Sequence, residues 1–132
     1  MKKIIIGLAI ASSLFIIGIV VLLRVNNQGK DVSSVAVSNV TIEGGKQVVT
    51  IRAKGGYLPK QSVAKAGMPT VLRFDTNGTF DCSSSLRISS LNITKTLPQT
   101  GSTDIDLGTA KAGTLQGTCG MGMYPFEVTF QG

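Results

Sequence analysis

From Lys46 onward, apolar side chains recur at every second position, which is the pattern of strands rather than of helices. Alternate residues of a strand point to opposite faces of its sheet, so one face of each segment is predicted to be buried. The segments are residues 47–54, 70–75, 86–88, 105–107 and 126–130. Glycine and proline turn formers separate them, and no segment after residue 24 shows a helical period. The pattern predicts an all-β sandwich or small barrel of about seven short strands.

Composition narrows the possible functions. The chain has 132 residues, enough for one small domain, and a net charge of +6. The Lys and Arg residues are spread singly and do not alternate with aromatic residues, so we expect no nucleic-acid binding. There is no histidine in the sequence. This absence excludes Ser-His-Asp and Cys-His catalysis, histidine-ligated zinc and the His₂Cys site of blue-copper electron carriers.

The N-terminal part of the sequence contains a long apolar segment. Residues 4–23 carry no charge, and 20 helical residues can cross a hydrocarbon core of roughly 30 Å. The alternative is a cleaved signal peptide, since Lys2 and Lys3 resemble its basic start. The run is longer than the apolar part of most signal peptides, and no small-residue cleavage site follows it. We therefore predict a retained single-pass anchor in the cell membrane.

The domain organisation follows from these two regions. We predict a membrane anchor at residues 1–23, a linker at 24–45 with one possible strand near 35–42, and a soluble domain at 46–132. Lys2 and Lys3 before the apolar segment favour an N-terminus on the inside and a domain on the outside. The preference is weak, because Arg24 and Lys30 follow the segment. The side of the membrane stays open, and we expect a monomer.

Sulfur atoms are concentrated in one short run near the C-terminus. Cys119, Met121 and Met123 are separated by single glycines. In an extended chain this spacing points all three side chains the same way, and in a loop the glycines let the backbone curl so that the sulfurs converge. Cys82 would supply a fourth sulfur if the strand before it, within residues 71–80, lies beside the final strand. Methionines separated by single glycines are poorly suited to a role in packing alone, because glycine weakens a strand and offers no side chain to pack.

Thiolates and thioethers are soft ligands, and together they select Cu(I). Zinc prefers more thiolate or histidine, and calcium and magnesium prefer oxygen. The hypothesis assigns Cys82 and Cys119 as the high-affinity thiolate pair, with Met121 and Met123 forming a weaker, exchangeable position.

Two other interpretations use the same cysteines. Cys82 and Cys119 could form a structural disulfide in an Ig-like surface binding domain without metal. A thiol oxidoreductase is disfavoured, because the sequence has no Cys-x-x-Cys motif and no histidine to activate a thiol. We therefore expect that the protein is not an enzyme.

A resemblance to a known family rests on the segments 56–59, 66–69, 74–76 and 119–123, together with Cys82. Through these segments, residues 46–131 resemble the cupredoxin-like domains of bacterial copper handling. With the membrane segment, the architecture is similar to that of CupA-type membrane-anchored Cu(I) chaperones. The resemblance implies a cupredoxin-like Greek-key β-sandwich or barrel after one N-terminal transmembrane helix.

That family also implies a site and a partner. Its matching positions hold a two-copper Cu(I) cluster, which implies Cys82, Cys119, Met121 and Met123 as the metal ligands here. The implied function is copper resistance, in which the chaperone passes Cu(I) to the metal-binding domain of a copper-exporting P-type ATPase.

Overall fold

The computed structural model describes residues 38–132. The predicted membrane helix and most of the predicted linker lie outside these residues. Within the described part, no helix has the length and apolar character needed to cross a bilayer. The secondary structure there consists of strands and two single-turn 3₁₀ helices.

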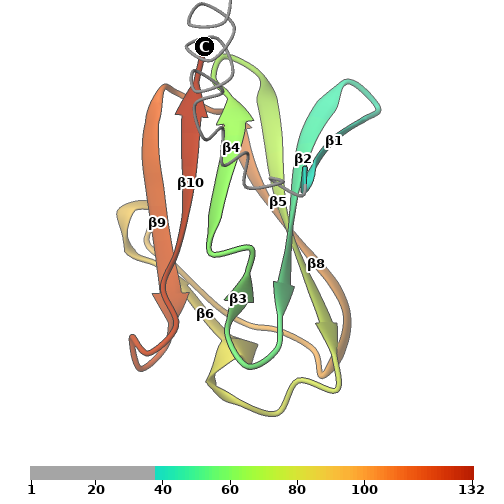
Figure 1. The fold of residues 1–132 in the computed structure, drawn as a ribbon, viewed down its shortest axis with the longest axis vertical. Helices are drawn as coiled ribbons and strands as arrows, with labels where there is room; N and C mark the ends of the chain where they lie inside the picture. Colours follow the sequence, from blue (N-terminus) through green and yellow to red (C-terminus); the bar gives the residue numbers. More distant parts are fainter. Residues whose placement is uncertain (1–37) are drawn as a thin grey trace, which may run out of the picture. The chain divides into compact units, whose positions relative to one another are not determined.

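The first sheet has five strands (Figure 1). Its order is β1-β2-β5-β8, with the short β3 paired to β2. Strand β2 runs parallel to β5, and the other pairs are antiparallel. Strand β1 falls within the segment 24–45, where one possible strand was expected. The bounds are β1 (Val40–Glu43), β2 (Lys46–Ala53), β3 (Tyr57–Leu58), β5 (Pro69–Asn77) and β8 (Thr100–Thr109).

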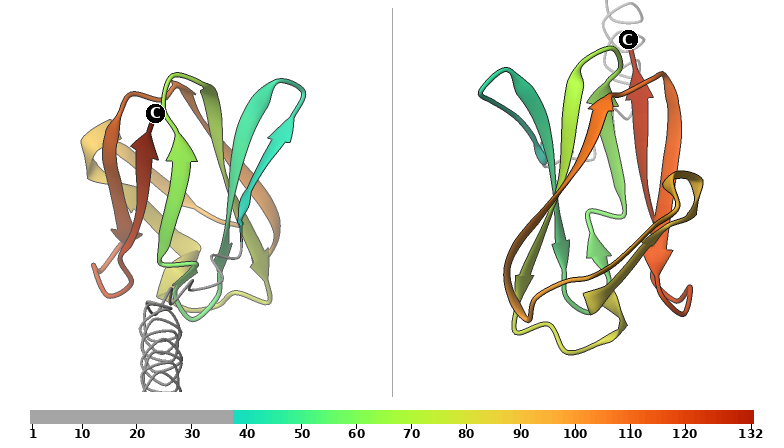
Figure 2. Two further views of the ribbon diagram at one scale, coloured as in Figure 1. Left: turned by 45° about the horizontal axis from the view of Figure 1, so that its top comes forward. Right: turned by 180° about the vertical axis from the view of Figure 1, so that it is seen from behind.

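The second sheet also has five strands, in the order β4-β10-β9-β6-β7 (Figures 1 and 2). Strand β10 runs parallel to β4 and antiparallel to β9. The 3₁₀ turns η1 (Cys82–Ser84) and η2 (Ser89–Leu91) lie on either side of β6. The bounds are β4 (Gln61–Lys65), β6 (Ser85–Ile88), β7 (Ile93–Thr96), β9 (Gly113–Cys119) and β10 (Phe126–Gln131).

The core between the sheets confirms the period-two pattern. The inward residues of β2, β5, β6 and β10 are buried, as their alternation predicts. At the centre, Tyr57, Phe74 and Phe126 pack edge to face, with ring centroids 5.0–5.8 Å apart. The described residues form ten strands rather than about seven, because short strands such as β3 and β7 give no clear alternating pattern. The prediction of an all-β sandwich is confirmed.

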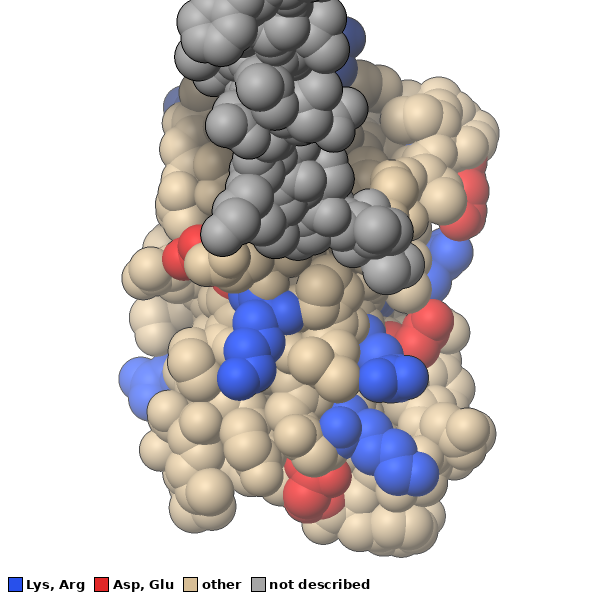
Figure 3. All heavy atoms as spheres, in the orientation of Figure 1, with Lys and Arg blue, Asp and Glu red and all other residues tan. Residues whose placement is uncertain are grey.

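Charged side chains bind the first sheet together on its outer face. Arg73 donates to Asp104 at 2.8 Å and to Glu43 at 3.0 Å, and Lys46 pairs with Asp106 at 2.7 Å. These contacts join residues of β1, β2, β5 and β8. Figure 3 shows Lys and Arg side chains distributed over one face of the molecule with Asp and Glu among them.

Candidate metal site

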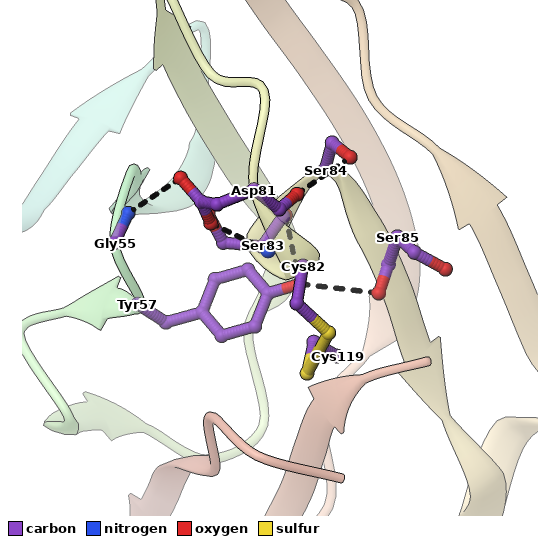
Figure 4. The surroundings of a disulfide bond; sticks show 8 residues. All are labelled: Gly55, Tyr57, Asp81, Cys82, Ser83, Ser84, Ser85 and Cys119. Atoms are coloured by element: carbon purple, nitrogen blue, oxygen red, sulfur yellow. Dashed lines mark hydrogen bonds between the residues drawn. A yellow bond between two sulfur atoms is a disulfide. The ribbon is translucent and has the colours of Figure 1, made fainter. Parts of the chain in front are cut away.

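The two cysteines lie next to each other at one end of the sandwich. Cys82 begins η1 and Cys119 ends β9, with their Cα atoms 5.8 Å apart and their sulfurs joined as a disulfide (Figure 4). The convergence of Cys82 and Cys119 agrees with the sequence analysis. Two cysteines this close can share a bond when oxidised, and once reduced they can share a metal ion.

The chain brings Cys82 to this position by a route other than the one considered from the sequence. Strand β5 pairs with β2 and β8 in the first sheet, so the condition considered there, that this strand lies beside β10, is not met. After β5 the chain passes through residues 78–81 into the second sheet, where β6 pairs with β9. The register sets Leu86 opposite Cys119, which brings η1 to the end of β9.

Asp81 holds the turn that carries Cys82. Its carboxylate accepts hydrogen bonds from the backbone N–H of Ser83 at 2.8 Å, from the Ser83 hydroxyl, and from the backbone N–H of Gly55 at 2.9 Å (Figure 4). These hydrogen bonds, chiefly that from the Ser83 hydroxyl, lower the pKa of Asp81. Asp81 therefore caps η1 and ties it to the β2–β3 turn.

Tyr57 supports the same turn from inside the core. Its hydroxyl donates to the Ser83 carbonyl at 3.0 Å, and its ring is fully buried. Burial raises the pKa of Tyr57, and the negative charge of Asp81 adds to the rise. The phenol therefore stays protonated and serves as a hydrogen-bond donor. Asp81 had not been singled out in the sequence analysis, although an Asp two residues before a Ser is a recognisable capping signal.

Replacing Asp81 with Ala is expected to destabilise the domain by about 1–2 kcal/mol, because the η1 turn loses its cap and its link to Gly55. Urea unfolding of the oxidised protein at neutral pH measures this loss. A midpoint equal to that of the unmodified protein would show that the turn needs no carboxylate.

The methionines lie on the loop that follows Cys119. The loop is anchored at its start, where Gly120 N–H donates to the Ser85 carbonyl and Gly122 N–H donates to the Cys119 carbonyl, both at 2.8 Å. A Cβ on Gly120 would lie 2.6 Å from the Ser85 hydroxyl, so any other residue there would force the Ser85 side chain to move. Gly122 has a φ of +76°, which also favours glycine.

The sulfur residues differ strongly in their access to solvent. Met121 is 75% exposed and Met123 is 59% exposed, whereas Cys119 is fully buried and Cys82 is half-buried. Within residues 38–132, no three His, Cys, Asp or Glu side chains gather in a group that could hold a metal ion. Of the four predicted ligands, the two cysteines are therefore the ones in contact with each other, and the two methionines are the ones most open to solvent.

The arrangement of strands defines the class of protein: an all-β sandwich with the cupredoxin-like fold. The chain belongs to the family of cupredoxin-like domains, whose family model matches residues 19–129. No curated protein matches the chain.

Two solved structures show the same fold at low sequence identity. One is the metal-binding domain of the Cu(I)-exporting P-type ATPase CopA of Streptococcus pneumoniae D39, determined with Cu(I). It has a TM-score of 0.61 and 21% identity, covering 70% of this chain and 93% of that one. The other is described as a copper binding protein in the apo form, with a TM-score of 0.62, 22% identity, and coverage of 70% and 94%.

Proposed function

We propose that this protein is a membrane-anchored Cu(I) chaperone that passes its ion to the metal-binding domain of a copper-exporting P-type ATPase. The observation that carries the proposal is the meeting of Cys82 and Cys119 at the base of a loop bearing two exposed methionines. The proposal takes the disulfide as the oxidised, metal-free form of the site and the reduced pair as the form that binds copper.

Ligand chemistry supports Cu(I) as the cargo. Reduction of the pair provides two thiols that bind metal as thiolates, and the adjoining loop provides two neutral thioethers, a donor set that suits a soft monovalent ion. Binding would release the thiol protons, and each ion exchanged would remain Cu(I) throughout. The neutral thioethers of Met121 and Met123 would hold an ion more weakly than the thiolates do.

The comparisons support copper handling. One of the similar structures is a domain of a Cu(I)-exporting ATPase with Cu(I) bound, and the other is described as a copper binding protein. We propose that a metal-binding domain like that of the ATPase receives the Cu(I) and that this transfer serves copper resistance. The anchor proposed for delivery at the membrane is the apolar segment 4–23.

The exposed apolar residues near the cysteines suit contact with a recipient. Phe80 precedes Cys82 by two residues, and Met121 and Met123 follow Cys119 by two and four. All three are among the exposed large apolar side chains of residues 38–132. Removing them from water in a docked complex would favour association.

A Cu(I) titration tests the proposed function. Protein reduced under strictly anaerobic conditions should bind Cu(I) and develop ultraviolet thiolate-to-copper absorption without a blue colour. Protein with the disulfide intact should bind much more weakly, because its sulfurs are no longer thiolates. Equal binding by both forms, or none by the reduced form, would contradict the proposal.

Replacing both Met121 and Met123 with Leu is expected to leave one tightly bound Cu(I) and to remove a second, weaker one. Leucine keeps the size and apolar character but has no sulfur donor. Stoichiometry from a competition titration with a chromophoric Cu(I) chelator measures the result. Two tightly held ions in the double variant would show that the thioethers are not ligands.

The disulfide in the structure favours one alternative, an Ig-like surface binding domain fixed by the Cys82–Cys119 bond without metal. Counting thiols in protein unfolded without reductant separates the two functions. Absence of free thiols, together with no copper uptake after reduction, would support the metal-free domain.

A further inference from the structure

The methionine loop, residues 120–125, carries two sulfur atoms that the rest of the domain leaves largely uncovered. The loop joins β9 to β10 and projects beyond the ends of both strands (Figures 1 and 2). Met121 is 75% exposed and Met123 is 59% exposed, whereas Met68, in the turn before β5, is half-buried. An oxidant in solution would therefore reach the two loop sulfurs more readily than the sulfur of Met68.

The neighbours of the two methionines leave their side chains open. Gly120 and Gly122 flank Met121, and Gly122 precedes Met123, so these neighbours offer no side chain as cover. A Cβ on Gly122 would meet nothing within 4 Å, which shows open space around the tip of the loop. Met121 and Met123 also lie outside the buried core and outside the set of apolar side chains packed against it. An oxygen atom added to either sulfur would therefore disturb no packing between the sheets.

The loop is held at its two ends rather than through its methionines. At the start, Gly120 N–H donates to the Ser85 carbonyl at 2.8 Å. At the other end, Tyr124 packs against the core and Phe126 is buried within it. The backbone of the loop should therefore keep its place when the methionine side chains become polar.

We propose that Met121 and Met123 form a reversible oxidation site, at which a hydroperoxide converts their thioethers to sulfoxides while the domain stays folded. With hydrogen peroxide, the O–O bond breaks, one oxygen atom is transferred to the sulfur, and the other leaves as water. The sulfur loses two electrons and the peroxide gains them. Methionine sulfoxide reductases reverse the step, and the exposure of both side chains leaves them open to such enzymes.

Oxidation at this site would switch off the weaker copper position. This consequence rests on the proposed function, which takes the two thioethers as Cu(I) ligands. A sulfoxide sulfur has given a lone pair to oxygen, and the added oxygen is a hard donor, so the residue would no longer offer Cu(I) a soft ligand. The cysteine thiolates would keep their ion, so one bound Cu(I) would remain.

Peroxide treatment of the full-length, disulfide-bonded protein in detergent micelles tests the site without copper. The disulfide leaves no free cysteine to compete for the oxidant. After reduction of the disulfide, trypsin gives the loop methionines in peptide 112–132 and Met68 in peptide 66–73, so mass spectrometry can follow each. Met121 and Met123 should gain oxygen several times faster than Met68, and the urea midpoint of the oxidised loop should stay unchanged. Equal rates, or a lower midpoint, would overturn the proposal.

Copper binding after oxidation tests the consequence. The peroxide is removed, and the disulfide is opened with a phosphine reductant, which leaves sulfoxides in place. A competition titration with a chromophoric Cu(I) chelator should then show one tightly bound ion and the loss of the second, weaker one. Treatment with both classes of methionine sulfoxide reductase should remove the added oxygen and restore the second ion. Retention of both ions by the sulfoxide form, or removal of the oxygen without return of the second ion, would overturn the proposal.

Two variants identify the sulfurs responsible. Met68→Leu should still lose the second ion after peroxide treatment. The double variant with Met121→Leu and Met123→Leu should show one copper stoichiometry before and after treatment, and a peroxide effect that persists in it would overturn the assignment. Failure of the untreated, reduced protein to bind Cu(I) would instead contradict the proposed function, while oxygen uptake by the loop would still decide whether the modification site exists.

Discussion

Replacing Cys119 with Ser is expected to abolish tight Cu(I) binding by the reduced protein. The serine hydroxyl is a hard oxygen donor that stays protonated at neutral pH, and Cys82 would remain as a single thiolate. Loss of groups that merely orient ligands costs metalloproteins about 10- to 100-fold in affinity, so loss of a thiolate ligand should exceed about 100-fold. A competition titration against a chromophoric Cu(I) chelator measures the change.

A matched variant tests whether removal of any sulfur atom lowers the Cu(I) affinity. Met68→Leu removes a thioether from the turn before β5, away from the proposed ligands, and should leave the Cu(I) affinity unchanged. If Cys119→Ser still binds Cu(I) as tightly as the unmodified protein under reducing conditions, the ligand assignment fails. Circular dichroism of the variant checks that the β structure is retained.

Replacing Phe74 with Ala should have the largest effect on stability, a loss of about 3–5 kcal/mol in the free energy of unfolding. Phe74 is fully buried and contacts both Tyr57 and Phe126 edge to face, so alanine would leave a cavity between the two sheets. Because small domains have a total stability of about 5–15 kcal/mol, such a loss would unfold an appreciable fraction of the protein. Urea unfolding of the oxidised protein measures it.

Phe80 offers a control of the same residue type, since its side chain is 76% exposed. Phe80→Ala should change the free energy of unfolding by no more than about 0.5 kcal/mol. If the two phenylalanine variants unfold at the same urea concentration, the packing between the sheets does not determine the stability of the domain.

The inward faces of the strands could be predicted because alternation is a local property of the chain. Val49, Ile51 and Ala53 are all fully buried, as the period-two pattern of residues 47–54 predicts. The partners of each strand depend on contacts between distant residues, which alternation does not encode. The alternation of residues 70–75 therefore identified strand β5 but did not reveal that it pairs with β2 and β8.

In the candidate site too, features local to the sequence could be predicted, whereas contacts between distant residues could not. The clustering of Cys119, Met121 and Met123 is visible in the sequence because it lies within five residues. The proximity of Cys82 was expected, but it arises from the pairing of β6 with β9 rather than from β5. The support from Tyr57 depends on a hydrogen bond across 26 residues, which no local pattern reveals.

The ladder between β6 and β9 contains two residue pairs, and β7 is joined to the sheet through β6. The Cys82–Cys119 bond between η1 and the end of β9 therefore adds to the burial of Leu86 and Ile88 in holding the β6–β7 hairpin to the domain. Cleaving that bond without supplying an ion should let backbone amides at 85–96 exchange with solvent and expose the hairpin to proteases. If the proposed function holds, a bridging metal would restore this link, and the reduced, metal-free protein would be degraded faster than the copper-loaded form.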